Sequence, residues 1–284
     1  AQVGGIVGSW IITPAISGFI AYFIFMSAQK LIFDTDHPVS NAKKYVPMYM
    51  ALAGFVLAVV TIKKGLKHVV GDLNLTNVEI YGYALMVGIG VAIIGMTFVR
   101  RVKIEPNADK EMHFTNVERI FAVLMVVTAC CMAFAHGSND VANAIGPLAA
   151  VVSIVINDGE IAAKSTLAWW ILPLGGLGIV AGLALFGSRV MSTIGKGITH
   201  LTPSRGFAAE LAAASTVVIA SGTGLPISTT QTLVGAVLGV GMARGIAALN
   251  LGVIKTIVIS WVITLPIGAF LAVIFFFMLR LLLL

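Results

Sequence analysis

A polar cluster interrupts a long apolar stretch near the middle of the chain. Residues 135–144 read AHGSNDVANA, and both flanks are apolar. An ionisable group such as Asp140 is costly in apolar surroundings and usually has a function there. The oxygens of Asn139, Asp140 and Asn143 are hard ligands that suit a small cation such as sodium. Alternatively, Ser138 or Asn139 caps a helix that starts here, inside or just outside a membrane.

A second polar cluster lies about 90 residues further on. Residues 225–232 read LPISTTQT and precede another apolar segment. Proline followed by serine and threonine is typical of a helix N-terminus, where hydroxyls and free backbone amides can bind an anion. The alternative is an ordinary N-cap. No lysine or arginine lies near either cluster, so cations and dipoles would balance a bound anion, as in a cation-coupled symporter rather than an anion channel.

Two more ionisable side chains could take part in coupling or gating. Glu210 begins the segment that leads to the second cluster, and His136 begins the first. Glu210 is equally well explained as a first-turn residue at the membrane interface. His136 is either a proton carrier or a buried histidine with its hydrogen bonds satisfied.

The composition indicates which elements hold these residues. Of the 284 residues, 58% are hydrophobic and only 11% charged, and the mean hydropathy is +1.01. These values exclude a soluble globular domain, a disordered chain, a coiled coil and a nucleic-acid binder. The net charge of +6 is consistent with basic loops on the cytoplasmic side. Adjacent Cys130 and Cys131 predict neither a disulfide framework nor a metal site. We therefore expect an all-α, multi-pass integral membrane protein.

Nine apolar segments are candidates for crossing the bilayer. A span needs about 20 apolar residues, and the segments cover residues 4–33, 46–62, 81–99, 120–134, 138–156, 166–186, 207–222, 227–243 and 253–284. The loop at 100–119 is the most basic and is expected to be cytoplasmic.

Two longer stretches contain the polar clusters. Residues 120–156 and 207–243 are each 37 residues long. As straight helices they would reach about 55 Å, far more than the hydrocarbon thickness. Each contains helix-breaking residues, at 136–138 and at 222–226. The sequence thus predicts two discontinuous helices, a pattern that marks substrate sites in secondary transporters.

The two clusters resemble the paired signatures of the inorganic phosphate transporter family. Residues 136–144 read HGSNDVANA and residues 224–230 read GLPISTT, and the similarity is strongest over 120–284. Members are secondary transporters that carry phosphate with sodium or protons. Gln231 stands where many members have His, and Ser138 where many have Ala.

The resemblance implies roles for individual residues. Asn139, Asp140 and Asn143 would bind sodium, and family members have functionally important residues at the positions of His136 and Glu210. Phosphate would contact Asp140, Ser228, Thr229 and Thr230. Asp140 would thus belong to both the phosphate site and the sodium site.

An internal repeat suggests that a partner segment completes the protein. The run SWIITP at 9–14 recurs as SWVITLP at 260–266, with the two tryptophans 251 residues apart. Such self-similarity is typical of inverted-repeat transporters. We interpret residues 1–119 as the end of an N-terminal repeat with connecting helices, and 120–284 as the C-terminal repeat that carries the site. An upstream equivalent of 120–252 is not found within the chain, and the resemblance implies two copies of each signature.

The expected function is sodium-coupled phosphate symport by alternating access, in the inner membrane of a bacterial or archaeal cell. The expected partners are phosphate, sodium and lipid, with the missing repeat and a homodimer as further associations. Sodium is the coupling ion and no other cofactor is expected. The alternatives are proton coupling, a passive anion channel, and sulfate or arsenate as substrate. A membrane enzyme acting on phosphate esters is disfavoured, because the sequence shows no nucleophile–base pair and no metal triad.

Overall fold

The chain is a bundle of long helices. The computed structural model describes residues 2–62, 76–104, 114–160, 168–223 and 227–283, and these contain no β-strand. The described α-helices are α1 (Gln2–Ala28), α2 (Pro38–Val60), α4 (Asn77–Arg101), α6 (Thr115–Ile156), α7 (Ile171–Ser192), α8 (Pro203–Thr223), α9 (Thr229–Ala243) and α10 (Leu251–Leu283). Short π-helical segments η1 (Gln29–Phe33) and η3 (Thr193–Ile198) continue α1 and α7, and a 3-10 turn η4 (Ile246–Ala248) precedes α10.

Six of the described helical segments are long and apolar enough to cross a membrane. They are Gly8–Phe33, Pro38–Val60, Asn77–Arg101, Thr115–Ile156, Ile171–Ile198 and Leu251–Leu282. The expectation of an all-α, multi-pass membrane protein is therefore confirmed.

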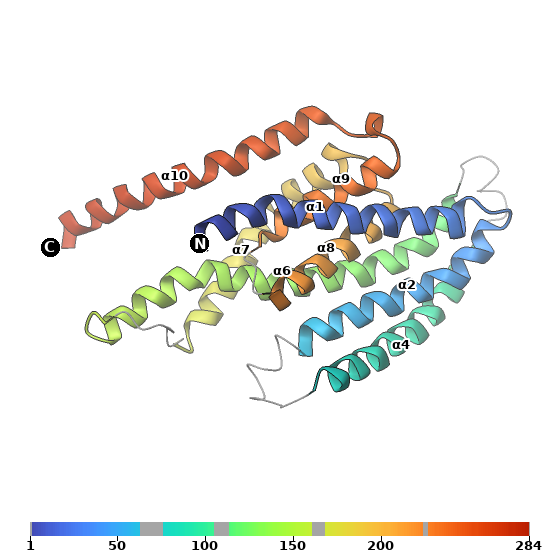
Figure 1. The fold of residues 1–284 in the computed structure, drawn as a ribbon, viewed down its shortest axis with the longest axis horizontal. Helices are drawn as coiled ribbons and strands as arrows, with labels where there is room; N and C mark the ends of the chain where they lie inside the picture. The colour runs from blue at the N-terminus through green and yellow to red at the C-terminus, as the bar shows by residue number, and fades with distance from the viewer. Residues whose placement is uncertain (1, 63–75, 105–113, 161–167, 224–226, 284) are drawn as a thin grey trace.

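Close helix contacts at glycines define the packing. Gly54 of α2 meets Val91 of α4, and Gly95 of α4 meets Met50 of α2, so these two helices run antiparallel. Pro14 of α1 lies against Gly235 of α9, and Gly18 of α1 against both Gly235 and Gly239. Figure 1 shows α1, α2, α4, α6 and α8 extended alongside one another. Glycines allow the backbones of membrane helices to approach this closely.

An aromatic cluster joins four of these helical segments. The ring of Phe121 (α6) stacks on Phe33 (η1) with centroids 5.6 Å apart and on Phe207 (α8) at 5.1 Å. Tyr49 of α2 adds a contact to Phe207 at 5.3 Å. Phe121 and Phe207 are fully buried, so this cluster fixes the N-terminal halves of α6 and α8 relative to α2.

The predicted interruption at 136–138 is wrong, because α6 runs without a break through all 42 residues. Gly137 costs only about 1 kcal/mol in a helix interior, which is too little to end a helix when no proline adjoins it. His136 and Asp140 also pair across one turn, which favours the helical conformation. Ser138 and Asn139 lie inside α6 rather than at a helix start. At about 63 Å, α6 is longer than the hydrocarbon is thick.

The chain is interrupted between α8 and α9, where Ile227 and Ser228 are not helical, while residues 224–226 of the predicted stretch 222–226 lie outside the described residues. Helix α8 ends at Thr223 and α9 begins at Thr229, with Ser228 at its N-cap. The end of α9 lies near the start of α8. Arg244, directly after α9, donates to Thr199 Oγ1, just before α8, at 3.3 Å. The two helices therefore enter and leave from the same end of the bundle.

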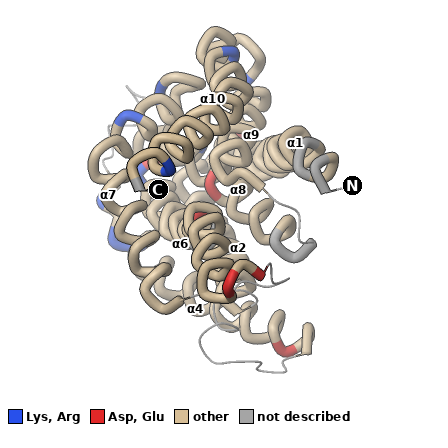
Figure 2. The backbone as a smooth tube through the Cα atoms, turned by 90° about the vertical axis from the view of Figure 1, so that its left-hand side faces the viewer, with Lys and Arg blue, Asp and Glu red and all other residues tan. Residues whose placement is uncertain are grey.

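Charged residues are few and unevenly placed. In Figure 2 the backbone is mostly tan, the basic segments lie at the periphery, and acidic segments also lie among α6 and α8. An ionisable residue inside a membrane bundle usually faces the interior or a cavity. These interior carboxylates are the starting point for the site.

Candidate functional site

The first cluster forms a stripe along one face of α6. His136, Asn139, Asp140 and Asn143 are spaced by three, four and seven residues on a continuous helix, which places them on the same side. His136 Nε2 lies 2.5 Å from Asp140 Oδ2. Asn139 Nδ2 donates to Asp140 Oδ1 at 3.2 Å. The unbroken helix, rather than a capped half-helix, therefore presents these groups together.

Asp140 also joins the two sequence clusters in space. Thr229 at the start of α9 donates its hydroxyl to Asp140, with Oγ1 at 2.9 Å from Oδ1 and 3.1 Å from Oδ2. The Thr229 side chain is buried, whereas the Asp140 side chain is 32% exposed. The two residues are 89 positions apart in sequence. Their contact places the carboxylate of Asp140 at the N-terminus of α9.

The N-terminus of α9 is built as the sequence predicts. Ser228 Oγ accepts from the Gln231 amide at 3.4 Å, and Thr232 Oγ1 donates to the Ser228 carbonyl at 2.8 Å. The partial positive charge of a helix N-terminus favours a nearby anion. In this structure Asp140, held by Thr229, is the anionic group at that position.

Three predicted residues are not among the hydrogen-bond partners of Asp140 in the described part of the chain. Thr230 and Asn143 are exposed. Gln231 is buried, and its Oε1 has no hydrogen-bond partner within the described part of the chain. The structure therefore groups His136, Asn139, Asp140 and Thr229, with Ser228 as the adjacent cap.

Glu210 forms a separate polar contact. Thr128 of α6 donates to Glu210 Oε2 at 2.6 Å. Twelve residues separate Thr128 from Asp140 on α6, about 18 Å along the helix axis. Sequence reasoning missed Thr128, because a lone threonine in an apolar helix carries no signal of its own.

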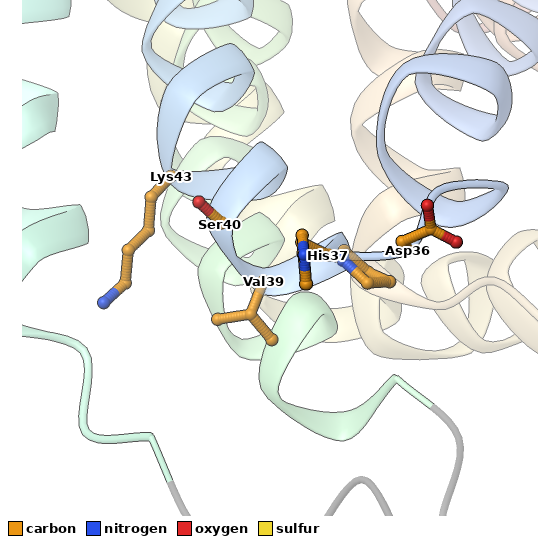
Figure 3. A pocket seen from close by; sticks show the side chains of 6 residues that line it. Asp36, His37, Val39, Ser40 and Lys43 are labelled. Carbon is orange, nitrogen blue, oxygen red and sulfur yellow. The ribbon is translucent and has the colours of Figure 1, made fainter.

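A surface recess lies elsewhere, at the turn before α2. It measures about 660 Å³ and is lined by Asp36, His37, Pro38, Val39, Ser40 and Lys43. Figure 3 shows the Asp36 and Lys43 side chains at opposite sides of it. Because these charges do not converge, the recess does not rival the Asp140 cluster. No group of three or more His, Cys, Asp or Glu side chains in the described residues could hold a metal ion.

Comparisons with known proteins place the chain in a family. Residues 1–272 match the family model described as the phosphate transporter family. The chain belongs to this family. A Haemophilus influenzae protein with the provisional name phosphate permease is 59% identical over 283 residues, covering 99% of this chain and 66% of that protein. A provisionally named phosphate permease of Pyrococcus horikoshii is 42% identical, covering 95% of this chain and 64% of that protein.

A solved structure supports the same fold. The chain superimposes on a protein described as the sodium-dependent phosphate transporter with a TM-score of 0.78 and 37% identity, covering 92% of this chain and 62% of that one. The chain thus spans slightly less than two thirds of the length of these relatives. It belongs to a family of transporters rather than to an enzyme family.

Proposed function

We propose that this chain is part of a sodium-coupled phosphate symporter and that the Asp140–Thr229 contact marks its substrate site. In this proposal Ser228, Thr229 and Thr230 donate to phosphate, and Asn139, Asp140 and Asn143 hold sodium. The observation that carries it is the carboxylate of Asp140 held at the N-terminus of α9 by a buried hydroxyl.

The carboxylate favours phosphate over sulfate as the anion. At neutral pH phosphate keeps at least one hydroxyl, which can donate to Asp140, whereas sulfate has none. A bare anion beside a carboxylate would leave two acceptors facing each other without a proton between them. A site that hydrogen-bonds a substrate hydroxyl strongly rejects an analogue that lacks it. Arsenate retains the hydroxyl and would be accepted.

Cations would offset the remaining negative charge. The nearest basic residues to Asp140 in sequence are Arg119 and Lys164, at least 21 residues away. With no lysine or arginine among its hydrogen-bond partners in the described residues, Asp140 is suited to a small hard cation. The name of the sodium-dependent structural relative supports sodium as that cation.

Proton coupling is a second candidate, favoured by His136. Its Nε2 lies within hydrogen-bond distance of Asp140 Oδ2, and a histidine beside a carboxylate can change protonation in the physiological range. In this case the proton would replace sodium as the positive charge next to the phosphate. Glu210 and Gln231 would then serve coupling or gating at a distance from the anion.

A second repeat would complete the site. The relatives extend by about a third beyond the part that this chain matches. Joining residues 1–284 to the unmatched part of the Haemophilus influenzae relative gives what we term the two-repeat protein. We propose that it works in the inner membrane of a bacterial or archaeal cell as an inverted-repeat transporter, alone or as a homodimer, without a cofactor other than sodium.

Uptake driven by separate gradients tests the coupling ion. The two-repeat protein in liposomes should accumulate radiolabelled phosphate when a sodium gradient is imposed and not when a proton gradient is imposed alone. Excess sulfate should not compete, whereas arsenate should. Uptake driven by protons without sodium would establish the second candidate, and uptake that follows only the phosphate gradient would identify a passive channel.

A further inference from the structure

Two arginines lie close together where the hairpin of α8 and α9 enters the bundle. Arg205 lies in the first turn of α8, and Arg244 directly follows α9. Arg244 Nη1 donates to Thr199 Oγ1 at 3.3 Å, and Arg205 Nη1 donates to the carbonyl of the next residue, His200, at 2.8 Å. The segment before α8 therefore holds both guanidinium groups within one small area. In Figure 1 the loop between α9 and α10 lies at the end of the bundle where α1 turns into α2.

The positive charge of these two side chains, which we term the hairpin arginine pair, has no direct acidic partner in the described part of the chain. Neither Arg205 nor Arg244 forms an ion pair with Asp or Glu there. Glu118 is engaged elsewhere, because its Oε2 accepts from the Ser204 amide at 2.8 Å and its Oε1 accepts from the Ser204 hydroxyl at 2.6 Å. The hydroxyl and the carbonyl that the arginines contact are uncharged.

The two positive charges of the pair repel each other. Arg205 is partly buried and precedes the apolar part of α8. Burial and, to a smaller extent, the charge of Arg244 lower the pKa of Arg205, whereas Glu118 raises it. Arginine stays protonated at physiological pH all the same. An anion between the two guanidinium groups would offset the repulsion and accept charge-assisted hydrogen bonds from both.

A second pair of arginines lies at the same end of the bundle but is not held in this way. Helix α4 ends beside the start of α2, because the two helices are antiparallel, and Tyr49 of α2 contacts Phe207 near the start of α8. Arg100 and Arg101 in the last turn of α4 therefore lie at the end that carries the hairpin arginine pair. Both are exposed, and no hydrogen bond or ion pair joins their side chains to other described residues.

We propose that the hairpin arginine pair binds a phosphate group. Guanidinium groups bind the oxygens of phosphate through paired hydrogen bonds, and arginines that are already fixed in place lose less side-chain freedom on binding. The favoured source is the phosphodiester of an anionic lipid, because exposed Met242 and Ile246, on either side of Arg244 in sequence, offer apolar surface to acyl chains. Inorganic phosphate presents the same oxygens and is the other source to be tested.

The proposed phosphate-group site is separate from the Asp140 cluster. The 15 residues of α9 lie between the Asp140 contact at Thr229 and Arg244, which corresponds to about 22 Å along the helix axis. Neither arginine is among the hydrogen-bond partners of Asp140 in the described residues. The inference therefore adds a second anion site at one end of the bundle, and it does not rest on the proposed transport function.

Lipid binding can be counted by native mass spectrometry. The 284-residue chain in detergent micelles is titrated with phosphatidylglycerol, which is anionic, or with phosphatidylcholine, whose ammonium group offsets the charge of its phosphodiester. The chain should bind its first phosphatidylglycerol about tenfold more tightly than phosphatidylcholine, as expected when charge-assisted hydrogen bonds select the ligand. A separate calorimetric titration with inorganic phosphate tests the free ion.

Matched variants assign the binding to the hairpin arginine pair. Arg205→Gln with Arg244→Gln should weaken phosphatidylglycerol binding by about tenfold or more, because charged hydrogen bonds are lost. Arg100→Gln with Arg101→Gln removes the same charge at the same end of the bundle and should leave the affinity unchanged. Arg244→Gln alone keeps Arg205 in place, so it should weaken binding even if the double variant folds poorly. Equal thermal unfolding of the variants and the unchanged chain is the control for folding.

Three results would overturn the inference. They are unchanged lipid and phosphate affinities in the folded hairpin variants, equal losses in both arginine pairs, which would show that net charge alone attracts the anion, and equal affinity for the two lipids without arginine-dependent binding of inorganic phosphate. If only inorganic phosphate binds, and the hairpin substitutions weaken that binding, the phosphate-group site stands with the free ion as its ligand.

Discussion

At the scale of single residues, Asp140 organises the proposed site. It collects hydrogen bonds from Asn139 of its own helix and from Thr229 of α9, and it pairs with His136. The exposed third of its side chain can still meet a ligand. A bound phosphate would therefore compete with Asp140 for the Thr229 hydroxyl or bridge between the two.

Removing the Thr229 hydroxyl should weaken phosphate binding. Thr229→Val keeps the shape of the side chain but loses a donor to a charged acceptor, worth about 1.5–3 kcal/mol. Phosphate affinity of the two-repeat protein, measured by calorimetry at saturating sodium, should fall about ten- to hundredfold. Thr216→Val is the control, since that buried hydroxyl donates to the Ala212 carbonyl within α8. Equal affinity in the two variants would move the anion away from Thr229.

The sequence predicted the members of this cluster but not the partner of Glu210. The two sequence motifs predicted Asp140 and Thr229 as site residues. The structure brings these residues, 89 positions apart in sequence, into contact. The sequence could not reveal that Thr128 binds Glu210, because this contact depends on how α6 and α8 pack. The exposure of Thr230 likewise follows from the rotation of α9 against its neighbours, which no local pattern encodes.

At the scale of elements, the same type of evidence succeeded at one interruption and failed at the other. The stretch at 222–226 contains both glycine and proline, and it lies between α8, described to Thr223, and α9, which begins at Thr229. The stretch at 136–138 contains glycine but no proline, and α6 continues. Both stretches are longer than the hydrocarbon is thick, which predicted a break in each. The small cost of a glycine in a helix interior nevertheless permits a continuous α6.

The continuity of α6 can be tested at Gly137. Gly137→Ala should raise the melting temperature of the protein, because alanine is favoured by about 1 kcal/mol in a helix interior and its Cβ would meet no atom within 4 Å. Thermal unfolding followed by circular dichroism measures this. A lower melting temperature would show that Gly137 needs a backbone conformation outside the helical region.

A larger side chain at the contact between α1 and α9 should instead lower the melting temperature. Gly239→Ala places a Cβ against the Gly18 carbonyl of α1, so the helices must separate and the melting temperature should fall. Gly90→Ala in α4 is the matched control, because its Cβ would have no neighbour within 4 Å and it gains the same helix propensity. If both variants unfold at the same temperature, α1 and α9 do not pack as described.

At the scale of the whole molecule, we propose that two repeats share one site. Helix α1 packs on Gly235 and Gly239 of α9, whereas residues 262–282 of α10 are exposed in the described part of the chain. Length and hydropathy predicted the membrane helices. The SWIITP repeat suggested an internal duplication, which stays a prediction. The packing of α1 on α9 could not be predicted, because it depends on contacts between residues more than 200 positions apart, such as Pro14 and Gly235.

Sodium-driven uptake of phosphate into liposomes tests the central claim most directly. The two-repeat protein should accumulate radiolabelled phosphate under an imposed sodium gradient, and the 284-residue chain alone should not. Asp140→Asn should abolish the sodium dependence, because it removes the carboxylate of the cluster while keeping its size. Wild-type rate and sodium dependence in Asp140→Asn, or equally fast sodium-driven uptake by the 284-residue chain alone, would contradict the account.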